Sequence, residues 1–177
     1  MITFFQDKFV HGENKMNLGI YIKNLMDADQ VSLLADFVNT NIKRRDIKDI
    51  SIFYDNIGKI DKPINCGLFN STDLWNFSGD LIVTSLDAVF TSMSIVNGIN
   101  VYYYGWNDKP DIFKLIYATQ RKNIKVICRS EQDEKQLYRL TKTKPIGVDP
   151  NFTNILDIIN RCGYERCKNC KNVCRAE

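Results

Sequence analysis

Residues 81–90 read Leu81-Ile-Val-Thr-Ser-Leu-Asp-Ala-Val-Phe90, and residues 101–104 read Val101-Tyr-Tyr-Tyr104. The run from Leu81 to Thr84 is typical of a buried strand, and Ser85 is a residue type that caps helices. The helix that follows is expected to end at Gly98, before a second strand. A strand, a helix and a strand joined by short connections predict parallel strand pairing.

The same alternation extends in both directions from this unit. Further strands are predicted over residues 18–22, 49–54, 64–69, 125–128 and 145–148. The other helices are predicted to begin near Asp27 or Asp29, Asp73, Pro110, Ser130, and Asn151 or Thr153. The pattern predicts an α/β fold, a Rossmann-like three-layer domain whose mostly parallel sheet carries helices on both faces.

Length and composition limit the class of protein. The 177 residues, 44% hydrophobic and 25% charged, fit one domain with a core plus an appendage, and a net charge of +3 is too small to indicate nucleic-acid binding. No apolar run approaches the roughly 20 residues that span a bilayer. Residues 1–15 lack the apolar block of a signal peptide. We therefore expect a cytoplasmic protein, located in the host cytoplasm if the Ile-, Asn- and Lys-rich composition reflects a phage genome.

The C-terminal residues contain a C-x4-C-x2-C-x3-C cluster formed by Cys162, Cys167, Cys170 and Cys174. In a reducing compartment such a cluster binds metal more often than it forms disulfides, and four thiolates match tetrahedral Zn²⁺. An iron–sulfur cluster is the alternative, since the first three spacings match a plant-type ligand run, and a metal-free tail is the third reading. Apolar residues thin out after Asn160, which predicts an α/β domain over residues 1–160 and a metal-binding tail over residues 161–177.

Polar and aromatic residues follow the predicted strands, and ligands of parallel α/β sheets bind beyond the carboxyl ends of the strands. The residues expected to contact a ligand there are Thr84, Ser85, Tyr104, Gly105, Trp106 and Asp149. Alternation along the strand is expected to turn Tyr103 toward this crevice, where it and Trp106 would stack on a sugar or a base. The simpler reading is that aspartates cap helices and that aromatic rings pack in the core.

No catalytic residue is predicted. The chain has no Gly-rich phosphate loop, and His11 is its only histidine. These two features disfavour the familiar kinds of nucleotide binding and Ser/His/Asp catalysis.

Residues 50–152 resemble the N-terminal Rossmann-like half of GT-B glycosyltransferases. The segment Leu81–Phe90 looks like the strand and helix that place a Thr-Ser turn beside the acceptor. Lys125-Val-Ile-Cys-Arg-Ser-Glu131, followed by Pro145-Ile-Gly-Val-Asp-Pro-Asn-Phe152, is similar to the last strand, helix and turn before the second domain. The Asn of that turn is absent, because Ile146 separates Pro145 from Gly147. The cysteine cluster stands where the donor-binding second domain would begin.

The resemblance implies recognition of a sugar, a nucleotide or modified nucleic acid, but the donor machinery lies mainly on the second domain. We therefore expect a non-catalytic or partner-dependent, glycosyltransferase-like module with a structural zinc tail that acts in binding or assembly. The alternative is a glycosyltransferase-like enzyme or enzyme half, and the third is an iron–sulfur redox or sensing protein. Expected partners are another protein and a nucleotide sugar or glycan; nucleic acid stays open, and no membrane is expected.

Overall fold

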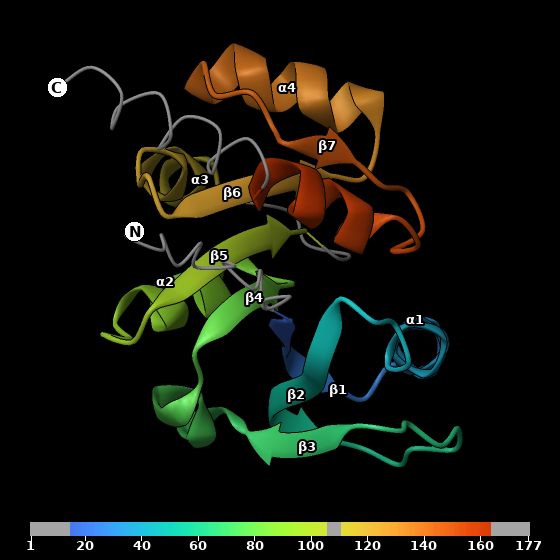
Figure 1. The fold of residues 1–177 in the computed structure, drawn as a ribbon. Coiled ribbons are helices and arrows are strands. Elements are labelled where there is room, and N and C mark those ends of the chain that lie inside the picture. The colour runs from blue at the N-terminus through green and yellow to red at the C-terminus, as the bar shows by residue number, and fades with distance from the viewer. Residues whose placement is uncertain (1–14, 106–110, 164–177) are drawn as a thin grey trace, which may run out of the picture.

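The computed structural model of the chain describes residues 15–105 and 111–163. Within these ranges one all-parallel sheet has the strand order β3-β2-β1-β4-β5-β6-β7 (Figure 1). The strands are β1 (Met16–Leu25), β2 (Ile47–Ile57), β3 (Gly67–Asn70), β4 (Gly79–Val83), β5 (Ile99–Tyr104), β6 (Ile124–Cys128) and β7 (Gly147–Val148). The order reverses between β1 and β4, as in Rossmann-like sheets. The predicted α/β fold with a mostly parallel sheet is confirmed.

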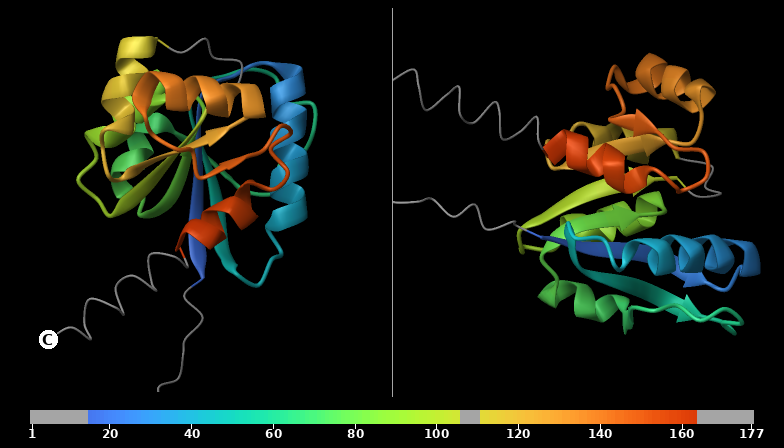
Figure 2. Two further views of the ribbon diagram at one scale, coloured as in Figure 1. Left: turned by 90° about the horizontal axis from the view of Figure 1, so that it is seen from above. Right: turned by 45° about the vertical axis from the view of Figure 1, so that its right-hand side comes forward.

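Helices cover both faces of this sheet (Figure 2). One face carries α1 (Ala28–Asn41) and a helix over residues 155–163, and the other carries α2 (Leu86–Met93), α3 (Ile112–Thr119) and α4 (Glu131–Thr141). The 3₁₀ helix η1 (Ser71–Asn76) connects β3 to β4. We call the face covered by α1 the α1 face and the face covered by α2, α3 and α4 the α4 face. Side chains alternate along β5, so Tyr102 and Tyr104 pack on the α1 face and Tyr103 packs on the α4 face.

Side-chain caps begin the helices at the positions expected from the sequence. The Asp27 carboxylate accepts from the Gln30 amide at 2.9 Å, Ser85 Oγ accepts from the Ala88 amide at 3.2 Å, and Ser130 Oγ accepts from the Asp133 amide at 3.1 Å. Each cap satisfies an amide that has no partner inside its helix.

Several helix boundaries differ from the prediction, among them the start of the last helix, which lies at residue 155 rather than at Asn151 or Thr153. Helix α2 ends at Met93 rather than at Gly98. Directly after Met93, the Ser94 hydroxyl donates to the Thr91 carbonyl at 2.6 Å and competes with the backbone hydrogen bonds of the helix. Helix α3 begins at Ile112, because Asp111 accepts from two amides of its first turn; Pro110, the predicted start, lies outside the described residues.

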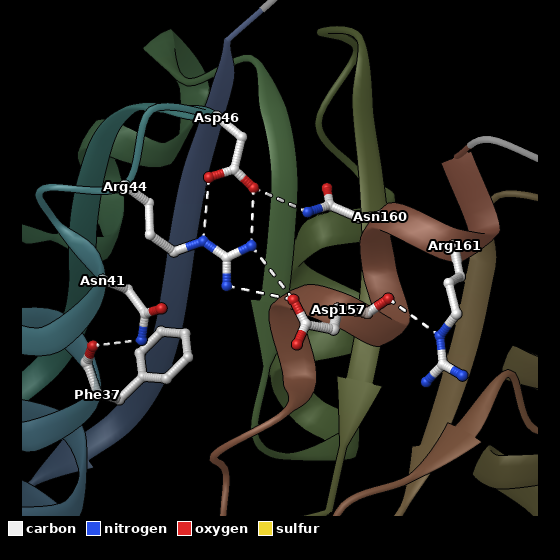
Figure 3. A network of polar contacts seen from close by, with 7 residues as sticks. All are labelled: Phe37, Asn41, Arg44, Asp46, Asp157, Asn160 and Arg161. Carbon is white, nitrogen blue, oxygen red and sulfur yellow. Dashed lines mark hydrogen bonds and ion pairs between the residues drawn. The ribbon is translucent and has the colours of Figure 1, made fainter.

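A polar network fixes the helix 155–163 to the loop before β2 (Figure 3). The Arg44 guanidinium donates to both carboxylate oxygens of Asp46, at 3.0 and 2.9 Å, and to Asp157 Oδ1 at 3.2 Å. Asn160 Nδ2 donates to Asp46 Oδ2 at 2.9 Å. The hydrogen bond from Arg44 holds the pKa of Asp46 below its usual value. The helix 155–163 crosses residue 160, where the sequence predicts the domain boundary.

Among the described residues, no helix is both long enough and apolar enough to traverse a lipid bilayer.

Candidate functional site

The strand order reverses between β1 and β4, and Thr84 follows β4 at this point. Thr84 is buried, and both its amide and its hydroxyl donate to the Tyr21 carbonyl of β1, at 3.2 and 3.3 Å. Ser85 beside it caps α2. The polar groups of both residues thus hold β4 and α2 in place at the carboxyl edge of the sheet.

An ion-pair cluster crosses the same edge. Asp87, in the first turn of α2, pairs with Lys23 Nζ of β1 at 3.3 Å and with Lys114 Nζ of α3 at 2.8 Å. The two ammonium groups, Lys114 foremost, hold the pKa of Asp87 below its usual value. All three side chains are about half exposed, so solvent and salt screen these pairs strongly. The cluster connects three elements, and its two lysines and one aspartate leave a net charge of +1.

The candidate site is a cavity of about 690 Å³ on the α4 face, beside β5 and β6. Side chains of α3 and α4, the helices labelled in Figure 1, line it on one side. Its apolar lining comprises Tyr103, Ile112, Leu115, Val126, Ile127, Cys128, Leu137, Leu140 and Pro150. Its polar lining comprises Arg129, Ser130, Asp133 and Gln136, and Gly105 completes the lining. A volume of this size and a mostly apolar lining with a few polar groups are typical of small-molecule sites.

The polar residues of the cavity gather where β6 leads into α4. Ser130 Oγ donates to Asp133 Oδ2 at 2.7 Å, so this carboxylate is held toward the start of the helix. Arg129 lies next to Ser130 and interacts with Tyr104, where its positive charge and hydrogen bonding partly oppose the rise in the Tyr104 pKa that burial causes. The cavity thus has an apolar interior and a rim with hydrogen-bond donors and acceptors.

The thiol at the cavity is held protonated. Burial, with the negative charges of Asp133 and Glu134, raises the pKa of Cys128 to about 12. Because the thiolate is the nucleophilic form, Cys128 is an apolar wall residue near neutral pH.

Asp149 lies beneath the carboxyl edge and is fully buried. Its carboxylate accepts from the amides of Asn151, Thr153 and Asn154, at 3.3, 3.2 and 2.8 Å. The Tyr104 hydroxyl donates to the Asp149 carbonyl at 2.9 Å. Together these bonds connect β5, β7 and the turn that begins the helix 155–163.

The residues predicted to contact a ligand therefore occupy three places. Gly105 lines the cavity, as does Tyr103; Tyr104 and Asp149 contact each other beneath the edge; Thr84 and Ser85 lie at the end of β4. Trp106 lies outside the described residues.

The contribution of α4 to the cavity was not anticipated from the sequence. Asp133, Gln136, Leu137 and Leu140 all line it. The sequence feature that could have indicated the cavity is the low apolar content of α4. A helix with few apolar positions leaves part of the sheet beneath it uncovered.

The predicted metal ligands fall mostly outside the described residues. Cys162 lies in the helix 155–163 and is partly buried, whereas Cys167, Cys170 and Cys174 lie beyond residue 163. In the described ranges, no group of three or more His, Cys, Asp or Glu side chains is placed to hold a metal. The zinc site, its iron–sulfur alternative and the separate tail stay predictions.

No family model, curated protein or solved structure matches this chain.

Proposed function

We propose that this chain is a ligand-binding module that performs no chemistry unaided, and that a sugar- or nucleoside-containing molecule binds in the cavity between α3 and α4. The observation that carries the proposal is the cavity itself. It holds about 690 Å³, and it opens where β5 and β6 end, at the edge of the sheet that ligands of such folds use.

The cavity lining supports binding rather than independent catalysis. Cys128 is held protonated, and the carboxylate of Asp133 already accepts a hydrogen bond from Ser130. The lining offers Tyr103 as an aromatic surface and Ser130, Asp133 and Gln136 as hydrogen-bonding groups. These are the components of a recognition site for a ring that bears hydroxyl groups.

The wider proposal includes a protein partner and a zinc-binding tail. The resemblance to a glycosyltransferase half favours a sugar-containing ligand and a second chain that closes over it. The cysteine spacing favours Zn²⁺ bound by Cys162, Cys167, Cys170 and Cys174. In that arrangement the metal would be structural, and any transferase activity would need the partner.

The experiment is a thermal-shift screen with nucleosides, nucleotide sugars and glycosides. A ligand at 100 times its Kd stabilises a protein by about 2.7 kcal/mol, which raises the Tm by several degrees for a chain of this size. The variant Leu140→Trp fills the cavity from α4, and Lys135→Trp, on an exposed position of the same helix, is the matched control. We expect Leu140→Trp to abolish the shift and Lys135→Trp to keep it.

Two outcomes would refute the proposal. One is the lack of any shift across the whole panel. The other is a shift that survives in Leu140→Trp, which would place the ligand elsewhere on the molecule.

A further inference from the structure

Every described helix that follows a strand carries a carboxylate of this chain at or near its N-terminus. Because the strands are parallel, these N-termini gather along the carboxyl edge of the sheet, where phosphates bind in many α/β proteins. The carboxylates are Asp27 and Asp29 at α1, Asp73 at η1, Asp87 at α2, Asp111 at α3, Glu131, Asp133 and Glu134 at α4, and Asp149 before the helix 155–163.

Several of these carboxylates occupy the amides that a phosphate would use. Asp111 Oδ1 accepts from the Phe113 and Lys114 amides, at 2.9 and 3.2 Å. Asp149 accepts from three amides, and Asp27 accepts from one. The chain thus provides its own anions at positions where a ligand anion would otherwise be stabilised.

The first turn of α4, beside the cavity, contains more carboxylates than the first turns of α1, α2 and α3. This turn contains Glu131, Asp133 and Glu134, and its Asp133 amide already donates to Ser130 Oγ at 3.1 Å. Of these three carboxylates, Asp133 lines the cavity, so a phosphate at this end would meet its negative charge. Like charges repel, and Glu131 and Glu134 of the same turn add to that negative potential.

Among the residues that the structure describes, three cations of this edge, Lys23, Lys114 and Arg129, have partners within the chain. Lys23 and Lys114 both pair with Asp87. Arg129, the cation that lines the cavity, interacts with Tyr104 and lies next to the acidic first turn of α4. A ligand phosphate would have to compete with these internal contacts.

We propose that the cavity takes an uncharged ligand, a nucleoside or a glycoside with an apolar substituent, and discriminates against its phosphorylated forms. The inference rests on the proposed binding function. The planar or apolar part of the ligand lies in the interior against Tyr103 and Leu137, and its hydroxyl groups bond to Ser130, Asp133 and Gln136. The acidic first turn of α4 excludes phosphate.

Matched ligand pairs test this directly by calorimetry: each nucleoside against its 5′-diphosphate, and phenyl glucoside against phenyl glucoside 6-phosphate. We expect the uncharged member to bind at least tenfold more tightly. The double variant Glu131→Gln/Glu134→Gln should bring the affinities of the uncharged and the phosphorylated ligand closer together. Asp29→Asn/Asp73→Asn removes two exposed carboxylates from the first turns of α1 and η1, and as a control with equal charge it should leave the ratio unchanged.

An NMR titration with inorganic phosphate separates the two proposals, because it needs no ligand of the cavity. We expect the amides of residues 131–134 to shift in Glu131→Gln/Glu134→Gln and not in the wild type. The inference about charge would be overturned if these amides shifted equally in the wild type and the variant, or shifted in neither protein. A nucleoside diphosphate that binds as tightly as its nucleoside would overturn it too. Binding of neither pair member would instead refute the binding function.

Discussion

Helices α1 and α4 both cover the same sheet, but they cover it very differently. Helix α1 buries Val31, Leu34, Ala35, Phe37, Val38 and Asn41, whereas in α4, described over its full length, only Leu137 is buried. Both faces carry a core of buried side chains, and the α4 face also has a cavity of about 690 Å³. The cavity is therefore a consequence of the polar sequence of α4, because the strands beneath it are as apolar as elsewhere.

The α1 face is closed by a second element. Phe152 packs its ring 4.7 Å from Phe37 and 5.1 Å from Tyr104, measured between centroids. Ile155 and Ile159 of the helix 155–163 are fully or almost fully buried in the same core. Two helices thus close the α1 face, whereas the α4 face leaves room for a ligand beside its own core.

The largest expected effect is on the α1 face. Leu34→Ala should lower the free energy of unfolding by about 3 kcal/mol, because it removes a fully buried side chain from a packed core. Leu137→Ala should cost about 1 kcal/mol, since Leu137 borders a space that already exists and has fewer atoms around it. Urea denaturation of the two variants measures the difference. Equal losses would mean that α4 is packed as tightly as α1.

The next effect concerns the turn before the helix 155–163. Asp149→Ala leaves three amides without their acceptor and should cost about 2 kcal/mol, at the upper end for a helix cap. Asp111→Ala is the matched control on the α4 face, where a similar carboxylate accepts from two exposed amides and its loss should cost about 1 kcal/mol. If Asp111→Ala proves the more costly, the α4 face is more dependent on its caps than on its packing.

Helix caps formed by neighbouring residues can be predicted from the sequence, whereas the Asp149 cap and the cavity cannot. Asp27, Ser85 and Ser130 cap as predicted, because a cap joins a side chain to an amide three residues away. Asp149 reaches amides up to five residues away, and this requires a turn with Phe152 at a positive φ of 59°. That conformation depends on the burial of the Phe152 ring, which no local pattern encodes.

The cavity was not predictable for a related reason. The sequence predicts Tyr103 and Gly105 at the crevice, and in the structure both line the cavity on the α4 face. The volume beside them, however, depends on the distance between α3 and α4, which is set by how the two helices pack on the sheet and not by the sequence of either helix alone. The low apolar content of α4 indicates weak coverage but does not locate the space that results.

A smaller, pH-dependent effect tests the network on the α1 face. Asp46 has a lowered pKa in the folded state because Arg44 donates two hydrogen bonds to it. Its stabilising contribution is therefore complete above the usual carboxyl pKa and is lost as the pH falls through the lower folded value. Asp46→Asn should cost about 1 kcal/mol at pH 7, as expected for a partly exposed network, and almost nothing near pH 2.

Asp87→Asn is the corresponding variant at the carboxyl edge of the α4 face. Its carboxyl pKa is also lowered, by Lys114 and then Lys23, so the direction of the pH dependence is the same. The side chain is more exposed than that of Asp46, 54% against 41%, and its partners are lysines rather than a bidentate arginine. The cost at pH 7 should thus be about half that of Asp46→Asn. A larger cost would show that the edge cluster holds α2 and α3 together.

The smallest effect is expected from removal of the metal. Elemental analysis should find one zinc per chain, and visible absorbance with iron would identify the iron–sulfur alternative. Cys162 lies near the end of the helix 155–163, whose buried side chains and contacts with Asp46 hold it to the α1 face without a metal. Chelation or Cys170→Ser should therefore change the free energy of unfolding of the α/β domain by less than about 0.5 kcal/mol. A loss comparable to that of Leu34→Ala would mean that the α1 face depends on the metal, because metal binding would then supply folding energy to the helix that closes it.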